Sequence, residues 1–284
     1  MATIQWFPGH MSKARRQVQE NLKFVDFVTE LVDARLPMSS RNPMLDQIIG
    51  DKPRLLVINK ADLADSKAIK TWQDYFSSKG LQTIIVNSKE SSTAKRLTTA
   101  AKKLMADKVA RNKERGIQNT TLRTMIIGIP NVGKSTLMNR LGGRKAAQTG
   151  NKPGVTKGQQ WLRSNPELEI LDTPGILWPK FEDDNVGLKL ALTGAIKDQL
   201  LPMDDVTIFG LRYLMENYPE ITAERLKLSD SDFELEIPDL IMELTKRKGF
   251  RDDYDRFYQT FVKDVRDGRF GNYCLDKVSD VEND

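Results

Sequence analysis

The chain has 284 residues, of which 39% are hydrophobic and 29% are charged, with a net charge of +5, so it has the composition of a globular protein that buries a core. Its one cysteine, Cys274, excludes an internal disulfide framework and is typical of a reducing compartment. No apolar run approaches the roughly 20 residues that span a bilayer, and the N-terminal stretch lacks the apolar segment of a secretory signal, so we expect a cytoplasmic protein with no membrane partner.

Apolar, β-branched runs alternate with amphipathic helical stretches over the first two thirds of the chain. The predicted elements, in chain order, are a strand in 24–34, a strand in 54–60, a helix in 66–80, a strand in 81–88, a long basic helix from about residue 92, a connector in 111–120, a strand in 122–129, a helix from residue 134, and two strands within 159–175. Alternation of this kind predicts a mostly parallel sheet with helices on both faces.

The pattern changes near residue 180, where apolar residues begin to recur at helical spacing with few strand signals. The sequence therefore predicts an α/β domain over residues 1–179 and an all-helical domain over residues 180–284. The charge divides at the same place. Residues 1–180 carry 30 Lys/Arg and 15 Asp/Glu, whereas residues 181–284 carry 14 and 24. A first part this basic is expected to attract nucleic acid, although a solvated lysine-rich helix explains residues 95–115 equally well.

The stretch Gly128–Thr136, GIPNVGKST, has the spacing of a phosphate loop and lies between a predicted strand and a predicted helix. Its glycines let the backbone N–H groups face phosphate oxygens. Lys134 is expected to place its charge near the β- and γ-phosphates, and the Ser135 hydroxyl is expected to bind Mg²⁺. We expect this loop to hold the nucleotide through consecutive residues: Asn131, Val132, Gly133, Lys134, Ser135 and Thr136.

Two later segments complete the expected catalytic set. DTPG, Asp172–Gly175, ends a predicted strand, where Asp172 can hold Mg²⁺ through water and the Gly175 N–H can reach a γ-phosphate. By itself the motif is also compatible with a β-turn. Thr156 lies between the phosphate loop and DTPG and is a candidate for a second Mg²⁺ hydroxyl. We expect Lys134, Thr156 and Gly175 to act in hydrolysis.

The early segment VINKAD, which ends at Asp62, follows a predicted strand and is typical of guanine recognition. The Asp62 carboxylate can accept two hydrogen bonds from guanine that adenine cannot offer. The Lys60 stem can lie over the ring, and the Ser88 N–H can meet the guanine carbonyl. We therefore expect a guanine pocket built from loops after two neighbouring strands: Asn59, Lys60, Ala61, Asp62, Asn87 and Ser88.

Guanine-reading motifs before the phosphate loop are the order found in circularly permuted GTPases. The segments WFPGHM, LVDARLPMSSRNP, GIPNVGKSTL and DTPGILWPKF resemble the ribosome biogenesis GTPase A family of bacteria, from the first residues to about residue 215. The resemblance implies a circularly permuted P-loop GTPase domain with GTP/GDP and Mg²⁺ as cofactors. It also implies slow hydrolysis that is stimulated by a precursor of the large ribosomal subunit during late assembly and coupled to release. The expected contacts are rRNA and ribosomal proteins, and the free protein is expected to be a monomer.

Ile176 stands directly after DTPG, where many GTPases have a water-orienting glutamine. The resemblance implies two substitutes. Asn131 is similar to an asparagine that helps to hold K⁺ in place of an arginine finger. His10, the chain's one histidine, is a candidate for acting near the attacking water, and its alternative role is structural packing beside Trp6. The alternative function is a nucleotide-gated module that binds rRNA or the ribosome, in which hydrolysis is incidental.

Overall fold

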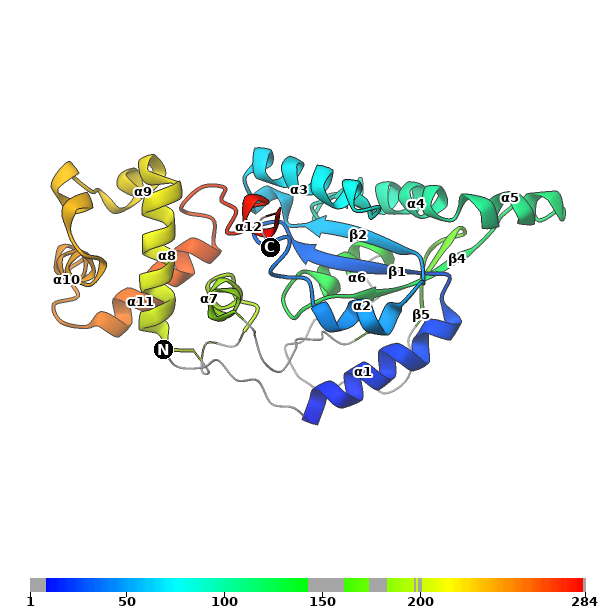
Figure 1. Ribbon diagram of the computed structural model, residues 1–284, viewed down its shortest axis with the longest axis horizontal. Helices are drawn as coiled ribbons and strands as arrows, with labels where there is room; N and C mark the ends of the chain where they lie inside the picture. The colour runs from blue at the N-terminus through cyan, green and yellow to red at the C-terminus, as the bar shows by residue number, and fades with distance from the viewer. Residues whose placement is uncertain (1–8, 143–160, 174–182, 197, 199–200, 283–284) are drawn as a thin grey trace.

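The computed structural model describes residues 9–142, 161–173, 183–196, 198 and 201–282, without the side chains of residues 9–14. Its centre is a six-stranded sheet in the order β3-β2-β1-β4-β6-β5 (Figure 1). Every neighbouring pair is parallel except β5–β6. The strands are β1 (Phe27–Asp33), β2 (Arg54–Asn59), β3 (Gln82–Ile85), β4 (Leu122–Ile127), β5 (Trp161–Asn165) and β6 (Leu168–Leu171). The predicted mostly parallel sheet is confirmed.

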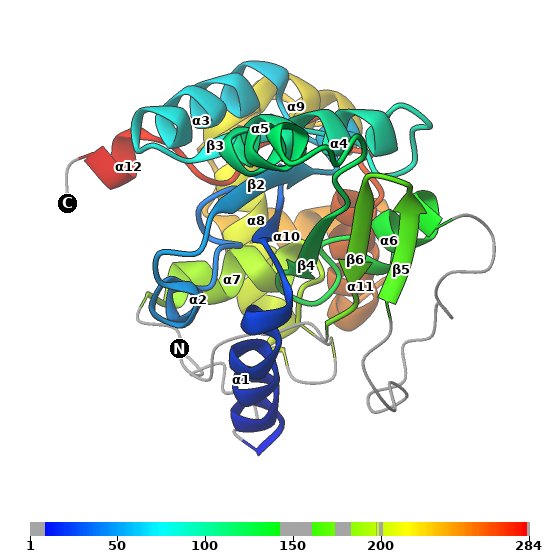
Figure 2. The ribbon, with the colours of Figure 1, turned by 90° about the vertical axis from the view of Figure 1, so that its right-hand side faces the viewer.

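Helices cover both faces of the sheet (Figure 2). All seven residues of β1 are buried, as expected of a central strand with both faces covered. Because alternate side chains point to opposite faces, Leu31 and Val28 pack into different layers. One layer contains α4 (Thr93–Leu104) and α6 (Lys134–Gly142). The other contains three helices: α1 (Gly9–Asn21), α2 (Pro43–Ile49) and α3 (Ser66–Ser78).

The order of the strands in the sheet differs from their order in the sequence. β4, which precedes the phosphate loop, lies between β1 and β6, although β1, β2 and β3 all come earlier in the chain. The carboxyl ends of the parallel strands therefore meet at one edge of the sheet, including those that precede NKAD and the phosphate loop. The chain reaches β4 through α5 (Ala106–Glu114), which extends beyond the sheet at the far right of Figure 1.

Three local expectations were wrong. The long basic helix expected from residue 92 is two helices, because the chain bends at Met105, which ends α4 and precedes α5. The expected connector at 111–120 begins later, since its first residues form the last turn of α5. The helix α2 was not expected. It begins at Pro43, where the Asn42 side chain accepts a hydrogen bond from the Met44 N–H and so caps the helix.

The part after residue 183 is helical, as the sequence predicts. Its helices are α7 (Asp184–Leu192), α8 (Met203–Asn217), α9 (Pro219–Leu226), α10 (Ile237–Arg247), α11 (Tyr254–Arg266) and α12 (Ser279–Glu282). The short 3₁₀ turn η4 (Asp230–Glu234) lies in this part, and the turns η1 (Leu22–Phe24) and η2 (Ala61–Leu63) lie in the first part. The boundary at 179/180 lies outside the described residues and stays a prediction. None of the described helices combines the length and the apolar character that a membrane span needs.

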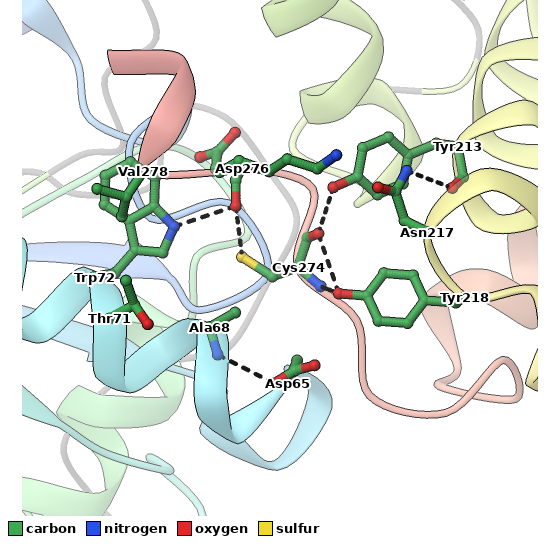
Figure 3. Close-up of a pocket in the computed structure, with 11 residues that line it drawn as sticks. Asp65, Ala68, Thr71, Trp72, Tyr213, Asn217, Tyr218, Cys274, Asp276 and Val278 are labelled. Carbon is green, nitrogen blue, oxygen red and sulfur yellow. Dashed lines mark hydrogen bonds between the residues drawn. The ribbon is translucent and has the colours of Figure 1, made fainter. Parts of the chain in front are cut away.

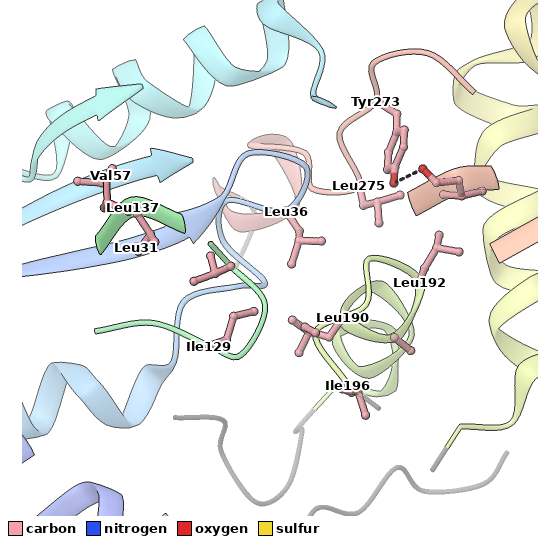
Figure 4. Packing of buried hydrophobic residues seen from close by; sticks show 14 of the residues in the cluster. Leu31, Leu36, Val57, Ile129, Leu137, Leu190, Leu192, Ile196, Tyr273 and Leu275 are labelled. Carbon is pink, nitrogen blue, oxygen red and sulfur yellow. Dashed lines mark hydrogen bonds between the residues drawn. The ribbon is translucent and has the colours of Figure 1, made fainter. Parts of the chain in front are cut away.

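The core is continuous between the sheet and the helices. Leu31 and Ile129 of the sheet side, Leu190 of α7 and Tyr273 beyond α11 belong to one buried cluster (Figure 4). The cluster continues into α8 and α11 through residues such as Phe257. The helices after residue 183 therefore pack on the sheet-containing part through a shared apolar interior.

The segment around residues 274–276 returns to the sheet and is held by hydrogen bonds to the loop that follows β1. The Leu275 N–H donates to the Arg35 carbonyl oxygen at 2.6 Å. The buried Asp276 carboxylate accepts from the Ser39 N–H at 2.7 Å, from the Ser39 hydroxyl at 2.6 Å, and pairs with Lys189 at 3.0 Å. The Trp72 indole of α3 donates to the Asp276 carbonyl oxygen at 3.2 Å, beside a 280 Å³ pocket between α3 and α8 (Figure 3).

Candidate functional site

The phosphate loop follows β4 and leads into α6, and its glycines are required by close packing. A Cβ on Gly128 would lie 2.5 Å from the Leu31 carbonyl oxygen. A Cβ on Gly133, whose φ is +104°, would collide with the side-chain amide of Asn59. The loop therefore packs directly on β1 and on the last residue of β2.

Lys134 is the first residue of α6, and its ammonium lies inside the phosphate loop. Its Nζ donates to the carbonyl oxygens of Gly128 at 3.0 Å and of Ile129 at 2.9 Å. Burial lowers the pKa of Lys134 to about 8, and the charge of Asp172 opposes that shift. Ser135 and Thr136 follow with exposed side chains, and the first turn of α6 contains no acidic residue, which suits a helix end that receives an anion.

Asp172 follows β6, the strand beside β4, and so reaches the same edge of the sheet as the phosphate loop. Burial raises the pKa of its carboxyl, while the Lys134 charge and a hydrogen bond from the Thr173 N–H oppose this. The neighbouring Thr173 hydroxyl donates to the Ile126 carbonyl oxygen of β4, which fixes the strand end. Asp172 and Lys134 therefore form an electrostatic pair beside the expected phosphate position. An oxygen-only donor set of Asp172 and the exposed Ser135 hydroxyl is the chemistry that Mg²⁺ prefers.

Asn59 joins three loops at the carboxyl end of β2. Its Nδ2 donates to the Val132 carbonyl oxygen of the phosphate loop at 2.9 Å. Its Oδ1 accepts from the Ser88 N–H at 3.0 Å and from the Ser88 hydroxyl at 2.7 Å. The side chain is buried, so each of these hydrogen bonds would be costly to lose. Asn59 therefore connects the guanine loops and the phosphate loop into one unit.

The remaining guanine-loop residues lie around Asn59. Lys60 has a left-handed backbone, with φ of +62°, and its Nζ pairs with the Asp33 carboxylate at 2.8 Å. The Ala61 N–H donates to the Val86 carbonyl oxygen at 3.2 Å, which ties the loop to the end of β3. Asp62, in the turn η2, is partly exposed and lies 3.3 Å from the Lys89 ammonium. Its carboxylate is therefore accessible to a ligand.

Asn87 is held by the start of α4. Its carbonyl oxygen accepts from the Thr93 hydroxyl at 2.7 Å, and its side-chain Oδ1 accepts from the Lys89 N–H at 3.0 Å. These bonds order the segment that carries Ser88. The loop after β3 is thus fixed on both sides, by Asn59 and by α4.

Asn131 reaches the helical part of the chain. It has a left-handed backbone, with φ of +58°, and its Nδ2 donates to the Gly194 carbonyl oxygen just after α7 at 2.7 Å. Its predicted role as a K⁺ ligand stays a prediction. His10 lies in the first turn of α1, but its side chain is outside the described part, as are Thr156 and Gly175 altogether, so their predicted roles also stay predictions.

The described site residues come together at one edge of the sheet. Sequence reasoning missed three residues that contact them, Asp33, Lys89 and Gly194. It also missed Arg35, which contacts Asp33. A signal for the first was present, since Asp33 ends a buried strand at the edge where the guanine motifs end theirs. No sequence signal connects Gly194 with the phosphate loop, because that contact depends on how α7 packs.

Comparison with known proteins also indicates a GTPase. A family model described as a 50S ribosome-binding GTPase matches residues 123–241, which begins on the phosphate-loop strand β4 and leaves β1, β2 and β3 before it. A ribosome biogenesis GTPase A of Bacillus licheniformis is 48% identical over 98% of this chain and 99% of its own length.

Two solved structures are similar over nearly the whole chain. A GDP-bound structure of TM YlqF, 24% identical, has a TM-score of 0.66 over 93% of this chain and 100% of that one. GNP-bound YlqF from T. maritima, 26% identical, has a TM-score of 0.64 over 93% of this chain and 98% of that one. With guanine loops, phosphate loop and full-length relatives in agreement, the chain belongs to the ribosome biogenesis GTPase A family of GTP-hydrolysing enzymes.

Proposed function

We propose that the protein is an assembly GTPase of the large ribosomal subunit, which binds a late precursor in its GTP state and is released on hydrolysis. The main support is the convergence of Asn59, Ser88 and the phosphate loop on one connected site, which suits guanine nucleotide. Further support comes from the relative that carries the name ribosome biogenesis GTPase A and from the 50S ribosome-binding family model. Such a protein would work in the cytoplasm.

The proposed chemistry uses residues of the phosphate loop and of the segments after it. Lys134 would exchange its two loop carbonyls for phosphate oxygens, Asp62 would accept from guanine, and the Gly175 N–H would reach the γ-phosphate. Ser135, Thr156 and, through water, Asp172 would hold Mg²⁺, which when bound neutralises charge developing on the β- and γ-oxygens.

Slow hydrolysis without a partner is part of the proposal, because Ile176 cannot orient water as a glutamine does. Asn131 would help to hold K⁺ near the phosphates, and His10 would act near the water once the ribosomal particle is bound. Asn131 supports a further link, since its contact with Gly194 connects the phosphate loop with α7, which follows the DTPG segment. Nucleotide state would in this way influence how the helical part is held.

The arm formed by α4 and α5 is the proposed rRNA contact. It carries six exposed basic side chains for which the described residues provide no ion pair: Lys95, Arg96, Lys103, Arg111, Lys113 and Arg115. The arm extends away from the helical part, at the right of Figure 1. A positive surface of this kind suits the phosphate backbone of RNA, and binding through it should weaken steeply with salt.

The test is sedimentation with purified large subunits and their precursors, with GDP or with a non-hydrolysable GTP analogue, together with turnover in K⁺ and in Na⁺. We expect co-sedimentation only with the analogue, and turnover that rises with the particle and in K⁺. If binding depends on nucleotide but the particle does not accelerate turnover, the nucleotide-gated binding module is correct, a function that Ile176 favours. Binding to neither particle would reject both.

A further inference from the structure

A buried carboxylate shared by two cations lies directly behind the guanine loop. Asp33 ends β1, and its side chain is 4% exposed. Its Oδ1 accepts from the Arg35 N–H and Nε, both at 3.0 Å. Its Oδ2 accepts from the Arg35 Nη2 at 2.8 Å and contacts the Lys60 Nζ at 2.8 Å. Both oxygens of this carboxylate are therefore fully engaged.

Lys60 is the residue between Asn59, which joins the loops, and the segment that carries Asp62. Its left-handed backbone and the contact with Asp33 fix both ends of its side chain. A lysine side chain loses much rotamer freedom when it is ordered, so a stem that is ordered before ligand arrives costs less on binding. The four methylene groups between these fixed ends are the part of Lys60 that a purine ring can lie against.

We propose that Asp33 is a positioning residue for guanine-nucleotide binding, whose carboxylate holds the Lys60 ammonium and so orders the stem over which the base lies. This inference rests on the nucleotide site of the proposed function and is independent of its ribosomal part. Asp33 acts through Lys60, whereas Asp62 contacts the base directly. The two carboxylates therefore differ in effect, since Asp33 governs affinity and Asp62 governs the preference for guanine.

The charge balance explains why the carboxylate is needed in ionised form. Burial raises the pKa of Asp33, but the charges of Arg35 and Lys60 outweigh it and hold the pKa below its ordinary value. Burial lowers the pKa of Lys60, and Asp33 opposes that shift. At 2.8 Å from this carboxylate, the Lys60 Nζ is placed to donate a hydrogen bond to it. Without Asp33, Arg35 and Lys60 would be two cations with no shared partner, and Lys60 would leave its position.

The test is a double-mutant cycle on GDP affinity, measured by calorimetry with the full chain carrying Asp33→Asn, Lys60→Met or both. We expect each single change to weaken GDP binding about tenfold and the double change to be no weaker than Lys60→Met alone, because both remove the same interaction. The ratio of ADP to GDP dissociation constants should stay within about twofold in Asp33→Asn, whereas Asp62→Asn should lower it.

Glu30→Gln is the matched control. Glu30 is also buried on β1 and also pairs with two arginines, Arg41 at 3.2 Å and Arg54 at 3.0 Å. It lies in the middle of the strand, however, and not at the end that borders the nucleotide site. It should lower the melting temperature and leave GDP affinity unchanged. Additive losses in the cycle, or an equal loss of affinity in Glu30→Gln, would overturn the proposal.

If Asp33→Asn fails to fold, the GDP affinities of Arg35→Met and Lys60→Met test the proposal instead. Arg35→Met removes two side-chain hydrogen bonds to Asp33 but keeps its contact with Lys60, so GDP affinity should be retained there and weakened about tenfold in Lys60→Met. Equal affinities in these two variants would overturn the assignment. Failure of the unchanged protein to bind GDP would instead reject the nucleotide site itself.

Discussion

Single residues set the shape of the nucleotide site, and Gly133 is the most constrained of them. Its φ is +104°, and a Cβ there would collide with the Asn59 amide that joins three loops. We expect Gly133→Ala to break the Asn59–Val132 hydrogen bond and to abolish detectable GDP binding by calorimetry, because the phosphate loop must move away from the guanine loops.

Gly80→Ala is the control for that substitution. Gly80 also has a positive φ, +79°, but nothing lies within 4 Å of a Cβ there. It should cost about 1 kcal/mol in the free energy of unfolding from backbone strain alone and leave GDP affinity intact. If both alanines spare nucleotide binding, the close packing at Gly133 does not matter to the site.

Lys134 makes nucleotide affinity depend on pH. Burial lowers its pKa to about 8 in the free protein, and bound phosphates favour the charged form, so the pKa is higher in the complex. The Lys134 contribution to affinity is therefore nearly constant around pH 7, where both states carry the proton, and falls above pH 8 as the free protein loses that proton. We expect GDP to bind about tenfold more weakly at pH 9 than at pH 7.

Calorimetry in buffers of different ionisation enthalpy checks this expectation, since binding at pH 9 should take up nearly one proton and binding at pH 7 almost none. The guanine base itself approaches its own titration above pH 9, so the comparison ends there. An affinity that is flat between pH 7 and pH 9 would contradict a Lys134 pKa near 8.

Among the elements, α7 is held at its C-terminal end by three different parts of the chain. Arg266 of α11 donates to the Ala191 carbonyl at 2.7 Å and to the Leu192 carbonyl at 3.1 Å. Arg35 donates to the Thr193 carbonyl at 3.3 Å, and Asn131 donates to the Gly194 carbonyl. Side chains of the sheet loops and of α11 thus donate to four successive carbonyls at this helix end, where intrahelical donors run out.

We expect Arg266→Met to destabilise the protein by about 2 kcal/mol, because the Leu192 carbonyl loses its donor, the Ala191 carbonyl keeps only its backbone donor, the Gly194 N–H, and Asp198 loses its partner. Chemical denaturation measures the change. Arg212→Met, an exposed arginine on α8, is the matched control and should shift stability by less than about 0.5 kcal/mol. Equal effects of the two substitutions would show that the contacts at the end of α7 add nothing.

The elements also show how far sequence reasoning reaches. The strands were predictable because β-branched apolar runs such as 54–60 end at recognisable sequence motifs. The grouping of the motif residues was predictable because the carboxyl ends of parallel strands lie at one edge of a sheet. The helix α2 was not predicted, because at 7 residues it is too short for its apolar residues Leu45, Ile48 and Ile49 to show a helical period. The pairing of Lys60 with Asp33 depends on side-chain direction, and that is set by packing that a linear pattern does not contain.

For the whole molecule, the shared interior predicts cooperative unfolding. The buried cluster runs from Leu31 of the sheet through Leu190 of α7 to Phe257 of α11, so neither part can lose its structure without exposing apolar surface of the other. We expect the nucleotide-free protein to unfold in a single calorimetric transition, with equal calorimetric and van't Hoff enthalpies. Two resolved transitions would show that the sheet and the helices are energetically separate.

The fastening of Leu275 and Asp276 onto Arg35 and Ser39 has a consequence for biosynthesis. A translating ribosome delivers both guanine loops and the phosphate loop long before it delivers the segment that covers Trp72 and completes the layer over α3. The nascent chain must therefore wait, with part of its interior open to chaperones, until residue 276 has been made and has left the ribosome. Stalled chains that end before and after residue 276 should accordingly differ in their ability to retain GDP on the ribosome that is making them.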